Sequence, residues 1–178
     1  LIVFQGDSCS LDAGTHVFSS ISVRGRLDVS GAVTLVSNTT IEVSQTGSIN
    51  GDSQGFPVNT ASPGCSTGAA FSGGSLGGNG GSSGVMGRAC GDHEWPTLPG
   101  SGGMAGTSSG AAGGAAVHLV SPDFELNGTV SMRGGNAAGG GGSGGSILIE
   151  VDRLYGYGTL DAGGGSASSH GGGSGGRL

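Results

Sequence analysis

Apolar and polar residues alternate in short runs over the first fifty residues of the chain. The runs are Ile21-Ser22-Val23, Leu27-Asp28-Val29, Val33-Thr34-Leu35, Ile41-Glu42-Val43 and Ser48-Ile49-Asn50. A period of two in β-branched residues is typical of strands with one buried face. Gly25, Gly31, Asn38 and Gly47 separate the runs. Hairpins usually need strands of about five or six residues, so such short runs favour strands that each pair with a counterpart one winding above and below.

A repeat of thirty residues occupies the last third of the chain. The segment 114–119 (GAAVHL) matches 144–149 (GGSILI), and the same offset aligns Phe124 with Leu154, 128–132 with 158–162, and 134–135 with 164–165. A further copy begins at 175–178, shifted by one residue, so we expect the windings to continue beyond Leu178. The second half of the unit, a glycine followed by alternating apolar residues, also occurs at 25–31 and 47–51.

These patterns predict an all-β fold, a single-stranded right-handed parallel β-helix (solenoid) with long Gly/Ser-rich loops. Residues 1–55 and 113–178 would form its coils, and 56–112 would be a Gly/Ser-rich excursion loop. Inward side chains such as Val117 and Ile147 would stack into a narrow apolar core. Glycine would occupy the corners, where left-handed or tightly bent backbone is easiest without a Cβ. The tracts 139–145 and 171–176 exceed a corner, and are either flexible loops or extended backbone packed closely on a neighbour.

Composition narrows the class of protein. Glycine accounts for 44 of the 178 residues, whereas charged residues make up 10%; globular domains average roughly 7% glycine and 25% charged residues. No three-residue collagen period persists, and the apolar runs and modest net charge of -6 disfavour simple disorder. No apolar stretch approaches the roughly 18 residues of a membrane span. All six basic residues are scattered arginines, which argues against a nucleic-acid surface.

The three cysteines indicate a secreted protein with one disulfide. They are Cys9, Cys65 and Cys90, and none has a partner at a spacing typical of a zinc site. We predict that Cys65 pairs with Cys90, because both lie in the glycine-rich segment that otherwise has little to hold it. Cys9 would then bond to another segment or chain, or remain a free buried thiol. No metal or cofactor is expected, and the missing signal peptide indicates a mature form or a fragment.

Candidate chemistry is sparse. Asp92 and Glu94 flank His93 beside Trp95, the only tryptophan, and could form a general acid/base pair next to an aromatic platform for sugar. The competing interpretation, which we favour, is a polar loop near a structural tryptophan, because polysaccharide enzymes on β-helices generally also use basic residues and this chain has no lysine. Catalytic residues are therefore not expected.

Two glycosylation sequons are present. They begin at Asn38 (Asn-Thr-Thr) and Asn127 (Asn-Gly-Thr), each in a connection between two expected strands, where a covalent glycan could project outward if the protein is secreted.

The end of the chain contains a glycine-rich tract that leads into Gly-Gly-Ser-Ile-Leu-Ile. It continues with Leu-Tyr-Gly-Tyr-Gly-Thr-Leu-Asp-Ala-Gly-Gly-Gly and with another tract that ends in Gly-Gly-Arg. This stretch resembles the repeats of large glycine-rich surface proteins of algae and protists, including mastigoneme-type fibre proteins. That resemblance implies an extracellular, glycosylated structural role with assembly into filaments. Residues 113–116 and 124–127 also resemble repeats of bacterial autotransporter passengers.

Three functions follow as hypotheses. The first is a structural subunit of an extracellular, glycosylated filament or coat at the cell surface, which self-associates through coil edges and glycine-rich loops or contacts other surface proteins. The second is an adhesin or carbohydrate-binding module, for which Tyr155 and Tyr157 are the only close aromatic pair. The third is a polysaccharide lyase or hydrolase centred on Asp92 and Glu94.

Overall fold

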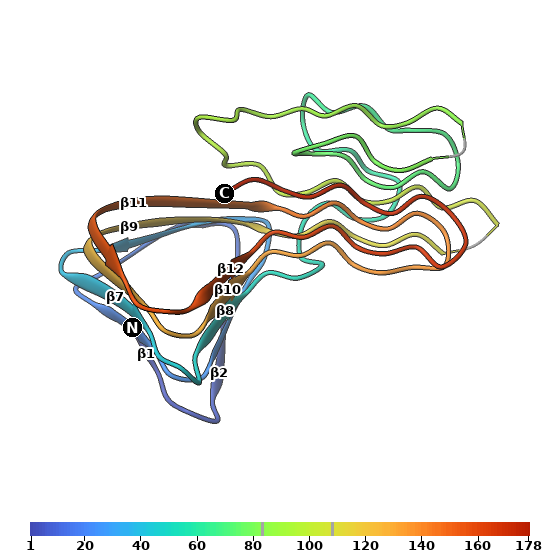
Figure 1. Ribbon diagram of the computed structural model, residues 1–178. Coiled ribbons are helices and arrows are strands. Elements are labelled where there is room, and N and C mark those ends of the chain that lie inside the picture. The colour runs from blue at the N-terminus through green and yellow to red at the C-terminus, as the bar shows by residue number, and fades with distance from the viewer. Residues whose placement is uncertain (83, 108) are drawn as a thin grey trace.

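The computed structural model describes residues 1–82, 84–107 and 109–178 (Figure 1). Every strand pairing within these residues is parallel. The strands are β1 (Ile2–Val3), β2 (Ser8–Leu11), β3 (Gly14–Phe18), β4 (Ile21–Val23), β5 (Arg26–Val29), β6 (Ala32–Ser37), β7 (Thr40–Val43), β8 (Ser48–Asn50), β9 (Ala116–Leu126), β10 (Thr129–Ser131), β11 (Ser146–Tyr155) and β12 (Thr159–Asp161).

The strands form two sheets. The seven-stranded sheet has the order β1-β4-β7-β9-β6-β3, with β11 also paired to β9, and the five-stranded sheet has the order β12-β10-β8-β5-β2. The larger sheet curves like half a barrel, because β9 pairs with β6 over its first half and with β7 over its second. The smaller sheet is flat and lies across the open side of the half-barrel. The apolar core lies between the two sheets (Figure 1).

The all-β class and the parallel pairing agree with the sequence analysis, but the predicted single-stranded right-handed β-helix is wrong. A half-barrel and a flat sheet replace it. The larger sheet is curved because β9 and β11 continue as single long strands through a bend. In the earlier part of the chain, the same bend lies between two separate strands, β6 and β7. Pro122 lies at this bend in β9, and its missing amide fits a position where the ladder to β11 is interrupted between Val151 and Arg153.

The predicted register of the repeat is confirmed. Val117 pairs with Ile147, Phe124 with Leu154, and Val130 with Leu160. The copy that begins near the end of the sequence also aligns with the one-residue shift, because Ser146 forms a bridge with Arg177. Apolar side chains therefore lie over one another from strand to strand, as in the column Leu27, Ile49 and Val130, all fully buried.

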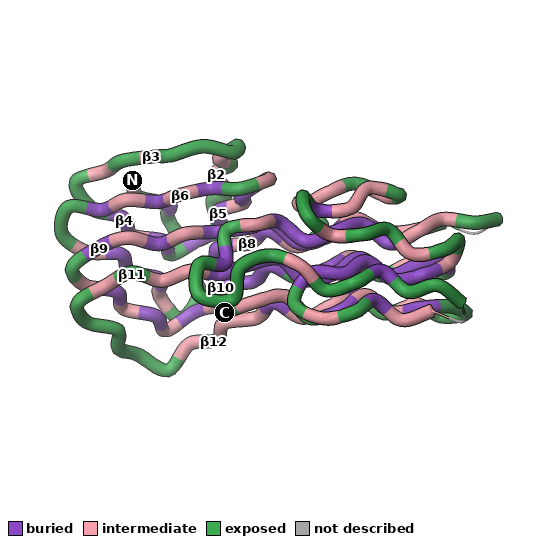
Figure 2. Tube along the Cα trace, turned by 90° about the horizontal axis from the view of Figure 1, so that it is seen from above, coloured by how far each residue is buried: buried purple, intermediate pink, exposed green. Residues whose placement is uncertain are grey.

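The glycine-rich tracts are ordered, and they leave the edge of the sheets as extended segments that lie side by side (Figure 1). Burial continues through the middle of this layer (Figure 2). We call the layer the glycine bundle; it consists of the tracts 132–145 and 162–176 and the described parts of 56–112 that lie beside them. The central tract 139–145 exchanges backbone hydrogen bonds with six neighbours, which are the segments around 74, 101, 109–111, 135, 165 and 171–174. A β-strand in a sheet has hydrogen-bonded neighbours on only two sides, so the bundle is not a third sheet.

In the glycine bundle, the hydrogen bonds from one tract to a given neighbouring segment recur at every third residue. The amide of Gly141 donates to the carbonyl of Gly171, and that of Gly144 to Ser174. The amides of Gly142 and Gly145 donate to Gly135 and Met132 on the opposite side. A period of three, without hydrogen bonds inside the segment, is the geometry of the polyproline II helix. We conclude that these tracts pack as polyproline II segments.

Close approach, and not a left-handed backbone, explains the glycine in these tracts. A Cβ at Gly142 would overlap the carbonyl of Ala112, and a Cβ at Gly173 would overlap the carbonyl of Gly142. No glycine of 132–145 or 162–176 has a positive φ. The alternative of flexible loops is therefore wrong for these tracts, whereas the corner expectation holds at Gly31, which has a φ of 69°.

A disulfide joins Cys65 to Cys90, as the sequence analysis predicts, with 4.9 Å between the two Cα atoms. It ties together two parts of the glycine-rich region. Buried serines reinforce the bundle where a backbone partner is missing: the amide of Ser101 donates to Oγ of Ser143, and the amide of Leu76 donates to Oγ of Ser174.

Candidate functional site

The short segment 90–98 lies on the outer face of the seven-stranded sheet and is held at both ends. At its start, Cys90 is in the disulfide and its carbonyl accepts a hydrogen bond from Nη2 of Arg177 (2.9 Å). At its end, the carbonyl of Leu98 accepts one from Oγ of Ser146 at the start of β11 (2.7 Å). A segment tied this way presents its side chains in a fixed position.

Asp92 shapes the turn that carries Trp95. Its Oδ1 accepts hydrogen bonds from the backbone amides of Glu94 (2.8 Å) and Trp95 (3.2 Å). These two hydrogen bonds are the main reason that the pKa of Asp92 lies below its usual value, and electrostatic interaction with His93 and Arg177 lowers the pKa further. Asp92 is thus an acceptor that holds the turn in its ionised form.

Trp95 stands over His118 of β9. The two rings meet edge to face, with 5.8 Å between their centroids and 72° between their planes. Trp95 remains half exposed (50%). Thr97 of the same segment and Thr34 of β6 border a small cavity beside His118, so the segment is seated directly on the sheet.

His118 in turn holds a carboxylate of the next strand. Its Nε2 donates to Oε2 of Glu150 in β11 at 2.5 Å, and the His118 side chain is only 16% exposed. His118 is paired across the strands with Leu148, and Glu150 lies two residues further along the same face of β11. Trp95, His118 and Glu150 therefore form one cluster, which we call the Trp95 platform.

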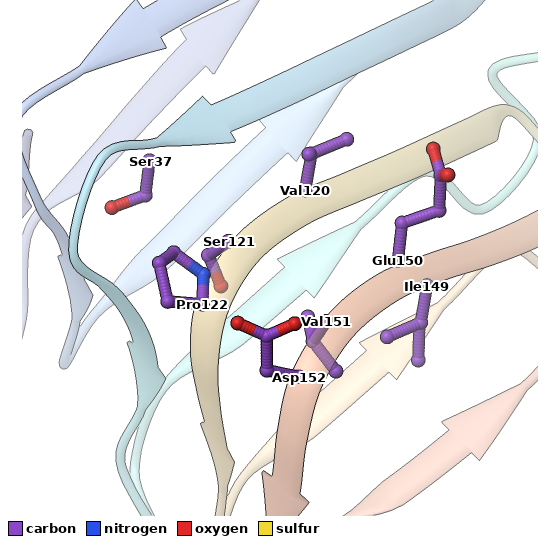
Figure 3. Close-up of a pocket in the computed structure, with 8 residues that line it drawn as sticks. All are labelled: Ser37, Val120, Ser121, Pro122, Ile149, Glu150, Val151 and Asp152. Carbon is purple, nitrogen blue, oxygen red and sulfur yellow. The ribbon is translucent and has the colours of Figure 1, made fainter.

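An open hollow adjoins the platform where β9 and β11 bend (Figure 3). Glu150 lines it as well, so the hollow and the Trp95 platform share that residue. In Figure 3 the carboxylate of Asp152 extends toward Ser121 and Pro122 of β9. The full lining is Ser37, Val120, Ser121, Pro122, Ile149, Glu150, Val151 and Asp152.

The structure places the sequence-derived candidates at this site but gives them different roles. Asp92, His93 and Glu94 share one exposed turn, and His93 and Glu94 point into solvent with side chains 80% and 85% exposed. Asp92 is occupied by the turn, so the three do not form a closed acid/base arrangement. Sequence reasoning missed His118 and Glu150. The repeat held a signal, because His118 is a polar residue at a position that its copy fills with Leu148.

A second charged pair, Asp123 and Arg153, lies beyond the bend on the same two strands. Nε and Nη2 of Arg153 donate to the two carboxylate oxygens of Asp123 at 2.5 and 2.8 Å. The Arg153 side chain is 75% exposed. These hydrogen bonds lower the pKa of Asp123 and raise the pKa of Arg153, so the pair is a surface ion pair that links neighbouring strands.

The two sequon asparagines lie at different corners. Asn38 is exposed in the connection between β6 and β7. Asn127 is half-buried in the connection between β9 and β10, where its Nδ2 donates to Oε1 of Glu125 (2.7 Å). Cys9, the remaining cysteine, is a free and half-buried thiol packed against the core, directly beside Leu27 of β5.

No cluster of three or more histidine, cysteine, aspartate or glutamate side chains suited to a metal ion occurs in the part of the chain that the structure describes. Residues 1–82, 84–107 and 109–178 also contain no helix able to cross a membrane.

Comparison with known proteins yields no relative. No family model matches the chain, and neither the curated proteins nor the solved structures contain a match.

Proposed function

We propose that this protein is a structural subunit of an extracellular, glycosylated filament or coat, without catalytic activity of its own, and that it associates with further copies through the ends of its two sheets. The observation that carries the proposal is that the strands at both ends have a partner on one side only. Strands β1, β2 and β3 end the sheets on one side, and β11 and β12 end them on the other.

Unpaired parallel strands present rows of free amides and carbonyls that can accept another strand. Large apolar side chains gather at the same two ends. Ile2, Phe4 and Val17 are exposed at one end, and Leu154, Tyr155 and Tyr157 at the other. An association that covered these residues would remove apolar surface from water.

The glycine bundle supports a structural role. Its segments are joined by backbone hydrogen bonds on several sides, which restrains the chain with few side chains. The disulfide supports, weakly, an extracellular location. Asn38 offers an exposed sequon at a corner, where a covalent glycan would not disturb the sheets.

The proposal is tested by measuring the size of the purified chain against concentration, by sedimentation velocity and by electron microscopy. We expect polymers that grow with concentration. Val17→Lys and Leu154→Lys, one at each end, should shift the distribution toward the monomer, because a charge at an edge opposes strand addition. Val85→Lys is the matched control, since Val85 is at least as exposed as the other two residues but lies in the glycine-rich region.

A monomer at every concentration would contradict the proposal. So would equal behaviour of all three lysine variants, because association would then not involve the ends of the sheets.

A further inference from the structure

We propose that the Trp95 platform and the adjoining hollow form a binding site for a neutral oligosaccharide. This site lies on the outer face of the seven-stranded sheet and includes the edge strand β11, and its ligand would be a sugar chain that is not covalently attached.

Trp95 supplies an exposed aromatic surface. The only ring stacked on Trp95 among the described residues is that of His118, which meets it edge to face, and Trp95 is half exposed. The apolar C–H face of a pyranose packs well on an indole, which is large, rigid and amphipathic. The segment is tied by the disulfide and by Ser146, so ligand binding would not need to order a mobile loop.

Hydrogen-bonding groups stand beside this surface. One carboxylate oxygen of Glu150, Oε2, accepts from His118, whereas Oε1 makes no hydrogen bond with a described residue. Asp152 lines the same hollow and makes no ion pair with a described residue. A carboxylate is an acceptor only, and paired sugar hydroxyls are its natural donors.

The charges select the class of sugar. Asp92, Glu94, Glu150 and Asp152 are the acidic groups around the platform and hollow. Of the nearby arginines, Arg153 is paired with Asp123, and Arg177 is half-buried against the segment with Nη2 bonded to the carbonyl of Cys90. An anionic sugar would therefore meet more negative than positive charge. A neutral, hydroxyl-rich chain is the ligand that fits both the aromatic face and the acceptors.

His118 is a positioning residue in this site. It packs against Trp95 on one side and fixes Glu150 on the other, so that the stacking surface and the hydrogen-bonding acceptor keep a constant relation. The three residues come from three separate parts of the sequence, and the parallel pairing of β9 and β11 brings His118 and Glu150 together.

Trp95 is the only tryptophan of the chain, so its fluorescence reports on this site alone. We would titrate the whole disulfide-bonded chain with cellohexaose, laminarihexaose and mannohexaose, and with trigalacturonate as the anionic counterpart. We expect at least one neutral probe to shift the emission saturably, with a Kd of about 1 mM or tighter, and trigalacturonate to give no shift. No saturable shift with any neutral probe, or equal binding of trigalacturonate, overturns the proposal.

Two variants, each with a matched control, test whether Glu150 and Trp95 contribute to binding. Glu150→Gln should weaken binding of the neutral probe about tenfold, through loss of a charged acceptor. Glu125→Gln, which changes a glutamate of the same sheet outside the hollow, should bind as the wild type does. Binding to Trp95→Ala, followed by ligand-detected NMR, should fall below detection, whereas Tyr157→Ala, which removes the most exposed aromatic side chain (99%), should not matter. Unaltered affinity in Glu150→Gln overturns the proposal even if Trp95→Ala fails to fold.

Discussion

Ile147 of β11 is paired directly with Val117 of β9, thirty residues earlier in the chain, and neither side chain is more than 2% exposed. Val33 of β6 continues the same column on the other side of Val117. The hydrophobic core is therefore a set of columns that run from strand to strand, in which each side chain packs on its counterpart in the neighbouring strand.

Replacement of Ile147 by alanine should open a cavity in this column and lower the free energy of unfolding by about 2–5 kcal/mol. Leu154→Ala, in the same strand, is the matched control, because Leu154 is 52% exposed at the edge of the sheet. Its cost should stay below about 1 kcal/mol. Chemical denaturation of both variants measures the difference, and equal losses would show that the columns are not packed as described.

Alanine should be tolerated very differently at two glycines of the bundle. A Cβ at Gly142 would overlap the carbonyl of Ala112, whereas a Cβ at Gly175 would meet nothing within 4 Å. Gly142→Ala must displace backbone and should destabilise the bundle strongly. Gly175→Ala should be neutral or stabilise by up to about 1 kcal/mol, through the smaller entropy of its unfolded chain. Similar melting temperatures for the two variants would argue against close packing of the tracts.

Loss of the disulfide should destabilise the glycine-rich region. The bond closes a loop with a sequence separation of 25 residues, for which about 2–4 kcal/mol is expected. We expect the double variant Cys65→Ser/Cys90→Ser to unfold at lower denaturant than the wild type, while Cys9→Ser leaves the midpoint almost unchanged. Thiol titration of the unfolded, unreduced chain should find one reactive thiol, and three would refute the pairing.

Glycan occupancy should differ between the two sequons. Asn38 is exposed, whereas the side-chain amide of Asn127 already donates to Glu125. When the chain is produced in a secretory eukaryotic host, peptide mass spectrometry should find Asn38 more fully occupied than Asn127. Higher occupancy at Asn127, or a bare Asn38, would show that exposure of the asparagine side chain does not control its modification.

Much of the strand pairing could be predicted from the sequence, because it depends on apolar residues at repeated offsets. The offset of thirty that aligns Val117 with Ile147 is also the pairing in the sheet. The division into two sheets could not be predicted in this way. It depends on where β9 bends near Pro122 and on which earlier strands lie on each side of that bend.

The sequence contains no apolar period from which the glycine bundle could be predicted. Polyproline II segments recognise one another through backbone groups every third residue, and glycine and serine carry no apolar period that would show it. The Trp95 platform was hidden for another reason. His118 and Glu150 lie 32 residues apart in the sequence, whereas the repeat pairs residues that are thirty apart. Their contact is therefore between neighbouring positions on adjacent strands. Predicting it requires both the register of the two strands and the face of the sheet on which each side chain lies.

Hydrogen exchange of the backbone amides in 139–145 tests the central claim most directly, which is that the glycine tracts form an ordered bundle. The amides of Gly141, Gly142, Gly144 and Gly145 each donate to a neighbouring segment, so we predict exchange as slow as that of the core strands. The amide of Gly84 donates to the side chain of Ser82 two residues away in an exposed hydrogen bond, and it should exchange rapidly. Exchange of the tract amides at the rate of an unstructured chain would contradict the account.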